Sequence, residues 1–389
     1  MNEKPIVIIG AGPAGLMAAH ELAVKGKKVH VYEKNKAAAR KFLVAGKGGF
    51  NLTHNEPIDS FVTKYDHPQM QAIVRDFDNK KVIEWLEGIG ITTYIGSSGK
   101  IFPTKNFKPI QVLNAWLSKL ELLGVEIHYE HQYIDFEGSN VYLEHQGKDV
   151  ILEFGHLVLA LGGGSWKKTG SDAKWIKALE EKKIEIMPLE SANSGYETSS
   201  TFTALQGQYL KNTKVSFESH SKLGELVFTK YGMEGSAIYY MNRFTRHRGF
   251  PLILSLDLKP GVCESEVFEL LKEAPKMSPV LKRQLKLSTT ALNLLKTLDK
   301  ASYLDPMILT KHIKSFPIEI LDYRPMDEVI STSGGVAFSS LSPTLEFNAF
   351  PRVYCAGEML DWEAPTGGYL LQGCFSTGAR VAKSILEES

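Results

Sequence analysis

Residues 6–15 read Ile-Val-Ile-Ile-Gly-Ala-Gly-Pro-Ala-Gly, an apolar run of strand length that passes directly into Gly-x-Gly-x-x-Gly. In this pattern Gly10 permits a tight turn, Gly12 lets the backbone approach a pyrophosphate, and Gly15 allows a helix to pack closely on the strand. We expect that helix over residues 14–25, with free amides and the positive end of its dipole at the turn. The turn therefore predicts an anion site that needs no basic side chain.

The next strand ends on an acid. Residues 28–33 read Lys-Val-His-Val-Tyr-Glu, and Glu33 stands at roughly the distance from the glycines where a carboxylate accepts hydrogen bonds from ribose hydroxyls. A βαβ unit with an ordinary tight turn is the alternative interpretation. We favour an adenine dinucleotide because strand, turn, helix, second strand and acid occur together, which is the context that the motif requires.

Length and composition limit the class of protein. The chain has 389 residues, which suits two or three domains. Its 45 Lys and Arg nearly balance its 44 Asp and Glu, so small molecules are the expected partners and nucleic acid is disfavoured. The three cysteines, Cys263, Cys355 and Cys374, form no CxxC pair, which disfavours a metal knuckle and a disulfide framework. We expect a cytoplasmic protein without membrane contact, because no apolar run reaches the roughly 20 residues that span a bilayer and no signal-peptide cleavage site is evident.

A basic, glycine-dense loop follows the second strand. Residues 39–54 read Ala-Arg-Lys-Phe-Leu-Val-Ala-Gly-Lys-Gly-Gly-Phe-Asn-Leu-Thr-His. The glycines would bring backbone amides close to a ligand, the basic side chains would neutralise phosphate charge, and Asn51 and Thr53 offer directional hydrogen bonds. The alternative is a mobile, solvated loop.

Helical and strand patterns then alternate, which predicts an α/β domain. Amphipathic segments over residues 69–89 and 109–123 are expected to be helical. Residues 156–165 repeat the opening pattern, a buried strand that ends in glycines. Ligands of a doubly wound sheet bind at the carboxyl ends of its strands. We therefore expect this second strand end to face the same crevice as the first turn.

The middle of the chain changes character. From residue 191 short strands are expected, over residues 213–219, 225–229, 236–241 and 252–256, and from residue 264 the apolar spacing is helical. We therefore predict a discontinuous nucleotide-binding domain of residues 1–190 and 320–389, a β-rich insert of residues 191–262 on the substrate side, and a helical subdomain of residues 263–319. The basic run of residues 242–248 is interpreted as a solvated surface stretch rather than a phosphate or nucleic-acid site.

The C-terminal segment returns to the nucleotide-binding style. A strand over residues 353–356 ends in Gly357-Glu358, where an acid can bind ribityl or pyrophosphate-linked hydroxyls. Residues 366–369 read Thr-Gly-Gly-Tyr and begin an apolar helix. The N-terminus of this helix would point at the N1/C2=O edge of an isoalloxazine and stabilise the anionic reduced flavin. The combination favours FAD over a bound NAD alone.

Taken together, these motifs resemble the three-domain bacterial flavoproteins described as aminoacetone-oxidase-like or NAD(P)/FAD-dependent oxidoreductases. The similarity covers nearly the whole chain and is carried by the opening glycines and by residues 45–54, 160–165, 224–232, 332–336, 356–361 and 365–369. It implies an α/β fold with a glutathione-reductase-type FAD/NAD(P)-binding Rossmann domain, split by a β-barrel-like insert and a small helical subdomain. The commoner family loop carries Arg-Cys where Gly49 and Phe50 stand, so no substrate role of that pair carries over. Residues 369–372 read Tyr-Leu-Leu-Gln instead of Tyr-Asn-Leu-Gln, which implies a divergent subfamily.

The predicted site combines all of these segments. Its cofactor-binding residues are Gly10, Gly12, Pro13, Ala14, Gly15, Glu33, Lys34, Arg40, Lys41, Gly46, Lys47, Gly48, Gly49, Asn51, Ala160, Leu161, Gly162, Gly163, Gly357, Glu358, Asp361, Gly367, Gly368 and Tyr369. We expect no metal ion. Four residues have acid–base chemistry, namely His54, Tyr231, Glu358 and Asp361. Each also has a simpler structural role, so none is assigned as catalytic.

The predicted function is that of a FAD-dependent oxidoreductase. A hydride would pass between flavin N5 and a small organic substrate or NAD(P)H, the latter as a transient co-substrate. An oxidase of small amines and an NAD(P)H-driven reductase of an unsaturated or steroid-like acceptor both fit. The alternative is a flavoprotein that acts on or senses an RNA or protein partner through residues 242–248, against which the near-neutral net charge argues. The sequence assigns no oligomeric state.

Overall fold

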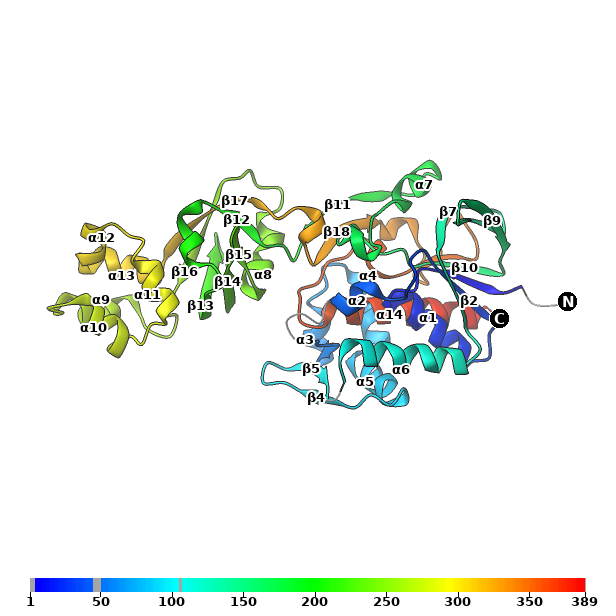
Figure 1. Cartoon of the computed structure of the whole chain (residues 1–389), viewed down its shortest axis with the longest axis horizontal. Coiled ribbons are helices and arrows are strands. Elements are labelled where there is room, and N and C mark those ends of the chain that lie inside the picture. Colours follow the sequence, from blue (N-terminus) through cyan, green and yellow to red (C-terminus); the bar gives the residue numbers. More distant parts are fainter. Residues whose placement is uncertain (1–3, 45–49, 105–106, 389) are drawn as a thin grey trace. The chain divides into compact units, whose positions relative to one another are not determined.

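The computed structural model describes residues 4–44, 50–104 and 107–388 (Figure 1). The chain divides into two compact units. The first consists of Met1–Glu190 and Ser331–Ser389, and the second of Ser191–Ile330. Each unit has its own hydrophobic core.

The first unit is built on a parallel sheet. Its strands lie in the order β19-β10-β1-β2-β6, and the neighbouring pairs are parallel. They are β1 Ile6–Ile9, β2 Val29–Glu33, β6 Glu126–Tyr129, β10 His156–Leu159 and β19 Val353–Cys355. β1 suits the centre of the sheet because all four of its residues are apolar and buried. The predicted Rossmann-type α/β fold is confirmed.

Helices pack around this sheet. They are α1 Pro13–Val24, α2 Arg40–Val44, α3 Ile58–Val62, α4 Pro68–Asp76, α5 Asn79–Gly88, α6 Pro109–Leu122, α7 Trp175–Glu181 and α14 Tyr369–Glu387. α1 and α14 lie side by side (Figure 1), and a Cβ at Gly378 would come within 2.2 Å of the Ala14 carbonyl oxygen. Glycine at this position therefore lets α14 contact α1 closely.

The helical predictions for this unit hold, with one refinement. The segment 109–123 is α6, and the segment 69–89 is two helices, α4 and α5. The Asp78 carboxylate accepts hydrogen bonds from the amides of Lys80 and Lys81, so it caps a new helix.

Smaller sheets complete the first unit. Strands β3 Thr53–His54, β5 Lys100–Pro103 and β4 Thr93–Ile95 form one, and β7 His131–Glu137, β8 Asn140–His145 and β9 Lys148–Glu153 form another. Strands β11 Ile186–Ala192 and β18 Ser331–Val336 pair where the chain leaves and re-enters the first unit.

The second unit contains a closed barrel with the strand order β12-β15-β14-β13-β16-β17. The strands are β12 Tyr196–Thr198, β13 Tyr209–Phe217, β14 His220–Phe228, β15 Gly232–Glu234, β16 Leu252–Asp257 and β17 Phe316–Tyr323. Its later helices are α9 Glu264–Lys272, α10 Met277–Pro279, α11 Thr289–Leu295, α12 Lys300–Leu304 and α13 Pro306–Lys314. Barrel residues such as Ile318 and helical residues such as Leu271 are buried in one shared core.

The strand predicted over residues 236–241 is wrong. These residues begin the helix α8 Ser236–Thr245. The buried side chains recur with the helical period, at Ala237, Ile238, Met241, Asn242 and Thr245. The six-residue window that suggested a strand was too short to reveal this period.

The basic run of residues 242–248 is therefore only partly a solvated stretch. Asn242 is fully buried, where its side-chain amide donates to the Ser194 carbonyl oxygen at 3.1 Å and its Oδ1 accepts from the Ser194 amide at 2.5 Å. Arg248 is exposed and pairs with Glu218 at 3.2 Å. Within the described part of the chain, no helix is both long and apolar enough to cross a membrane. The predicted domain boundaries at residues 191, 263 and 320 stay predictions.

Candidate functional site

A cleft opens in the first unit at the carboxyl ends of β1, β2, β10 and β19. It encloses about 920 Å³, part of it open to solvent. Twelve predicted residues line it, namely Gly10, Gly12, Pro13, Ala14, Glu33, Lys34, Lys41, Ala160, Leu161, Gly162, Gly357 and Glu358. Segments far apart in the sequence thus converge where an open α/β sheet binds ligands.

The three glycines of the opening turn each meet a different constraint. Gly10 has a φ of +105°, and a Cβ there would lie 2.3 Å from the Ala160 carbonyl oxygen. A Cβ at Gly15 would lie 2.0 Å from the Gly10 carbonyl oxygen, so only glycine lets α1 pack on the turn. Gly12 is the N-cap of α1, and apart from its neighbours along the chain no described atom lies within 4 Å of its Cβ position. The structure thus leaves room for a phosphate beside Gly12, at the positive end of the α1 dipole.

The Glu33 carboxylate is held in a fixed orientation. Its Oε2 accepts a hydrogen bond from the Ala11 amide at 3.0 Å, and its Oε1 accepts from the Asn35 amide at 2.9 Å and from Asn35 Nδ2 at 2.6 Å. Arg40 donates to Asn35 Oδ1 at 2.9 Å. Glu33 is 7% exposed and lines the cleft, so it suits the role of acceptor for ribose hydroxyls.

The predicted loop of residues 39–54 is wrong in part, because Arg40–Val44 form the helix α2 and Thr53–His54 form β3. Lys41 of α2 and the acid Glu358 meet at the cleft. Lys41 Nζ lies 2.6 Å from Glu358 Oε2 and donates to Ser165 Oγ at 2.8 Å. Lys34 Nζ pairs with Asp172 at 2.8 Å on the same cleft. The two acids leave the lysines partly neutralised, and each pair fixes the position of its basic group beside the glycine turn.

Other predicted residues gather at the start of α14. Gly368 has a φ of +104°, and a Cβ there would lie 2.6 Å from the Thr53 backbone. The Tyr369 hydroxyl donates to Glu56, and its ring stacks on His54 with centroids 5.5 Å apart. Burial and the neighbouring Glu56 carboxylate raise the pKa of Tyr369. Burial opposes ionisation of Glu56, but hydrogen bonds, the largest from Tyr369, lower its pKa.

Comparison with known proteins places the chain in a family. It matches the family described as HI0933-like protein Rossmann domain over residues 4–384. The chain belongs to this family. The predicted resemblance and fold class are thereby confirmed.

Curated relatives match nearly the whole of the HI0933-like chain. The ribosomal RNA dihydrouridine synthase of Haemophilus influenzae is 26% identical over 400 residues, covering 97% of this chain and 98% of the relative. The 3-dehydro-bile acid delta(4,6)-reductase of Clostridium scindens is 25% identical over 429 residues, covering 98% of this chain and 99% of the relative. Among solved structures, the 3-ketosteroid-delta4-(5alpha)-dehydrogenase of Rhodococcus jostii has a TM-score of 0.53 at 15% identity, covering 98% of this chain and 95% of that chain. The last similarity supports the fold.

Some predicted residues of the HI0933-like chain lie away from the cleft. Gly163 does not line it, and a Cβ at this residue would lie 2.4 Å from Thr332 Oγ1. The Asp361 amide donates to the Val336 carbonyl oxygen at 2.9 Å, and Asn51 lies two residues before β3. Gly367 precedes the N-cap of α14 with a φ of +114°. Gly46, Lys47, Gly48 and Gly49 lie outside the described residues.

Other residues that line the cleft were not predicted from the sequence. They are Ile9, Tyr32, Asn35, Ala39, His131, Gln132, Tyr133, Thr169, Gly170, Ser171, Asp172, Lys174, Trp175 and Cys374. Asn35 could have been predicted from the sequence, because it stands two residues after Glu33. Trp175 could not, since it reaches the cleft from α7, where its Nε1 donates to the Gly162 carbonyl oxygen at 2.8 Å. Burial raises the pKa of the Cys374 thiol, so it stays protonated at neutral pH.

The acid–base candidates of the HI0933-like chain have structural partners. His54 Nε2 lies 3.0 Å from the Ser98 carbonyl oxygen, and its Nδ1 accepts from the Glu56 amide at 3.2 Å. In the second unit, the Tyr231 hydroxyl donates to Glu234, and the Arg324 guanidinium lies 4.0 Å from the centroid of the Tyr231 ring. Burial and the Glu234 carboxylate raise the pKa of Tyr231.

Proposed function

We propose that this protein is a FAD-dependent reductase of a carbon–carbon double bond conjugated with a carbonyl group, with NAD(P)H as the electron donor. In the overall reaction the double bond gains a hydride equivalent and a proton, and NAD(P)H is oxidised to NAD(P)⁺. When bound, FAD would supply the redox chemistry that relays these two electrons.

The observation that carries the cofactor proposal is the two-sided construction of the cleft. The glycine turn and Glu33 come from the N-terminal segment, and Gly357 and Glu358 come from the C-terminal segment. A mononucleotide would need only the side built by the N-terminal segment. FAD has an adenosine, a pyrophosphate and a ribityl chain, which suit Glu33, Gly12 and Glu358 in turn. The predicted residues that line the cleft are proposed to bind FAD, and the start of α14 is proposed to face its isoalloxazine.

The substrate class rests on chemistry that the relatives share. A dihydrouridine synthase and a delta(4,6)-reductase are both named for reduced carbon–carbon double bonds. In uridine the C5=C6 bond is conjugated with the C4 carbonyl, and in a 3-oxo-Δ4 steroid the C4=C5 bond is conjugated with the C3 carbonyl. Hydride attack at the β carbon produces an enolate in both, and a proton then adds at the α carbon. We propose the barrel of the second unit as the substrate side.

Phe50 marks a difference between this chain and the commoner family loop. It stands where the commoner family loop carries Cys, and it is 8% exposed. Its ring packs edge-on against Phe42 with centroids 4.9 Å apart. The position therefore serves the hydrophobic core, and it offers no thiol to a substrate.

The test mixes the purified, flavin-loaded protein with NADH or NADPH without oxygen and then adds an acceptor. We expect NAD(P)H to bleach the flavin and 4-androstene-3,17-dione or unmodified ribosomal RNA to restore its colour with formation of the reduced product. Bleaching by a small amine, with peroxide formed in air, would show an oxidase and overturn the proposal. Protein that takes up no FAD after reconstitution would overturn the cofactor as well.

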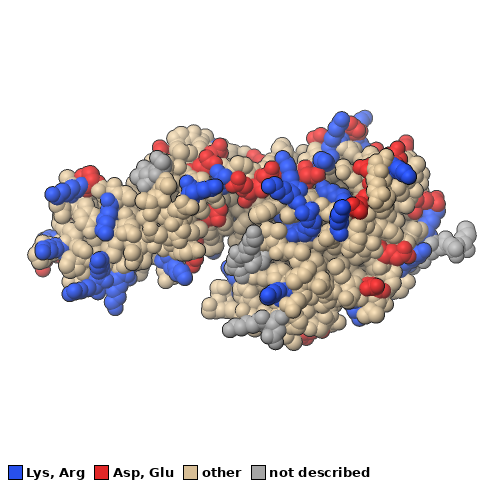
Figure 2. All heavy atoms as spheres, in the orientation of Figure 1, with Lys and Arg blue, Asp and Glu red and all other residues tan. Residues whose placement is uncertain are grey.

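A uridine in RNA is the second candidate substrate, because a full-length relative is named for it. The charge distribution gives no support, since the net charge is +1 and Lys and Arg lie beside Asp and Glu on the visible face of the first unit (Figure 2). The same experiment separates the candidates. Dihydrouridine formed in the RNA, measured by mass spectrometry, would favour the RNA substrate, and steroid reduction alone would favour the small molecule.

A further inference from the structure

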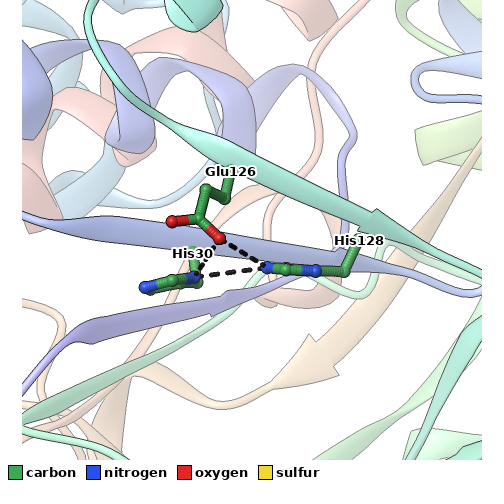
Figure 3. A group of neighbouring side chains, drawn as sticks. All are labelled: His30, Glu126 and His128. Carbon is green, nitrogen blue, oxygen red and sulfur yellow. Dashed lines mark hydrogen bonds and ion pairs between the residues drawn. The ribbon is translucent and has the colours of Figure 1, made fainter.

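A cluster of two histidines and a glutamate lies on the strand pair β2–β6, at the edge of the parallel sheet. In the register of this pair, His30 stands opposite Glu126 and Tyr32 opposite His128. Side chains two residues apart on a strand point to the same face. His30, Glu126 and His128 therefore converge on one face, as Figure 3 shows.

The three ligand atoms have the spacing of a metal site. His30 Nδ1 lies 3.2 Å from His128 Nε2, and Glu126 Oε2 lies 3.4 Å from the first and 3.6 Å from the second. A tetrahedral Zn²⁺ with bonds of about 2.0–2.2 Å has ligand–ligand edges of about 3.3–3.6 Å. The triangle thus matches one face of such a tetrahedron to within about 0.1 Å.

Hydrogen bonding alone explains the cluster less well. Only the distance between the two imidazoles falls within hydrogen-bond range, and the carboxylate oxygen stands back from both nitrogens. The ring centroids are 5.5 Å apart with planes inclined by 18°, so the two nitrogens face each other edge to edge. A bound ion would replace this hydrogen bond. Both imidazole rings would rotate so that their nitrogens point at the ion, and the Glu126 carboxylate would be the third ligand.

We propose that His30, His128 and Glu126 bind one Zn²⁺ ion, with water in the fourth position. Two histidines and one glutamate form a known zinc-ligand set that leaves a position open. Solvent can reach the site, because the side chains of His30, His128 and Glu126 are 13%, 33% and 56% exposed. The expectation of no metal rested on the absence of a local motif, and these ligands come from strands 98 residues apart.

The position of the cluster gives the ion a structural role. The Tyr32 ring stacks on His128 with centroids 4.5 Å apart and planes inclined by 16°. Tyr32 also lines the cleft, as does His131, whose ring contacts both Tyr32 and His128 edge-on. The ion would tie the edge strand β6 to β2 beside the cleft. This inference does not depend on the redox activity.

The test is a calorimetric titration of the full-length protein, freed of metal by a chelator, with Zn²⁺. We expect one equivalent to bind and to raise the melting temperature. Loss of outer-shell partners weakens metal sites by about 10–100-fold, so His30→Ala and His128→Ala should each weaken binding by at least about 100-fold. Glu126→Gln keeps the shape of an exposed side chain and should weaken binding by at least about 10-fold, which tests the site even if an alanine variant fails to fold.

The matched control is His156→Ala. His156 lies on β10 of the same sheet, 3.3 Å from Glu388, so it is a histidine beside a single carboxylate. This variant should bind Zn²⁺ as the wild type does. Absence of saturable binding at one equivalent would overturn the proposal. Equal loss of affinity in His156→Ala and His128→Ala, or unchanged binding in Glu126→Gln, would show adventitious binding only and would also overturn it.

Discussion

Replacing Gly12 by alanine separates cofactor binding from folding. Gly12 has a φ of −83° and a ψ of 178°, which is extended backbone that alanine adopts freely. Apart from its neighbours along the chain, the added methyl group meets no described atom within 4 Å. We therefore expect the free energy of unfolding of the apoprotein to change by less than about 0.5 kcal/mol.

The same methyl group occupies the space in which a pyrophosphate would approach the N-terminus of α1. Its volume pushes the phosphate oxygens out of hydrogen-bond range of the free amides. A hydrogen bond to a charged group contributes about 1.5–3 kcal/mol, so losing two weakens FAD binding by about 3–6 kcal/mol. That range corresponds to a loss of affinity of at least about 100-fold.

The assay titrates FAD into the apoprotein and follows the flavin fluorescence, with thermal denaturation of the FAD-free protein as the measure of folding. Gly88→Ala is the control, since Gly88 ends α5 and its Cβ position also has no described atom within 4 Å. It should bind FAD normally. Wild-type affinity in Gly12→Ala would refute the assignment of the turn to the pyrophosphate. A large fall in the melting temperature of its apoprotein would refute the claim of free space.

Three further predictions concern stability. Gly15→Ala brings a Cβ to 2.0 Å from the Gly10 carbonyl oxygen, so we expect a loss of about 3 kcal/mol or more in thermal unfolding, and a stable variant would contradict the packing argument. Burial, followed by the charge of Lys119, lowers the pKa of His20 to about 4. In the unfolded chain this histidine takes up a proton near its ordinary pKa of 6.5, whereas in the folded protein it does not. Its contribution to the free energy of unfolding is therefore complete above pH 6.5 and is lost as the pH falls toward 4. Between about pH 7.5 and pH 5, the free energy of unfolding measured in urea should fall by about 2 kcal/mol more in the wild type than in His20→Leu. The same fall in both proteins would exclude His20 as its origin. Tyr369→Phe removes the hydrogen bond to Glu56 and should cost about 1–2 kcal/mol at neutral pH and less below pH 4, because the folded state lowers the pKa of Glu56. An unchanged unfolding midpoint in urea would show that this bond contributes nothing.

Local motifs predicted those parts of the site whose residues lie close together in the sequence. The glycine turn and Glu33 belong to one βαβ unit, so their spacing along the chain determines their spacing in the fold. Lys41 and Glu358 were each predicted from a motif, but their contact joins residues 317 apart and follows from the sheet order. Trp175 reaches the cleft through tertiary packing, and no local pattern marks it.

The wrong strand at residues 236–241 shows the limit of periodicity. Alternation and a helical period are hard to tell apart over six residues, and the helical period is clear only once the buried pair Ala237–Ile238 is followed by Met241 and, one turn later, by Thr245. The packing of α8 on the barrel decides the outcome. A Cβ at Gly224 of β14 would lie 3.0 Å from the Ala237 Cβ, so glycine there makes room for the helix.

The position of β19 in the sheet sets a time order for making this protein on the ribosome. β10 ends at Leu159 and its neighbour β19 begins at Val353. One edge of β10 therefore has no partner strand until the intervening chain has been synthesised. At about 5–20 residues per second, that synthesis takes about 10–40 s. During this interval the cleft lacks Gly357, Glu358 and α14, and the complete sequence of the second unit is made before β19 appears. The nascent chain therefore cannot form its full cleft before Gly357, Glu358 and Cys374 have been made, and a cofactor that needs both sides of the cleft binds only after that.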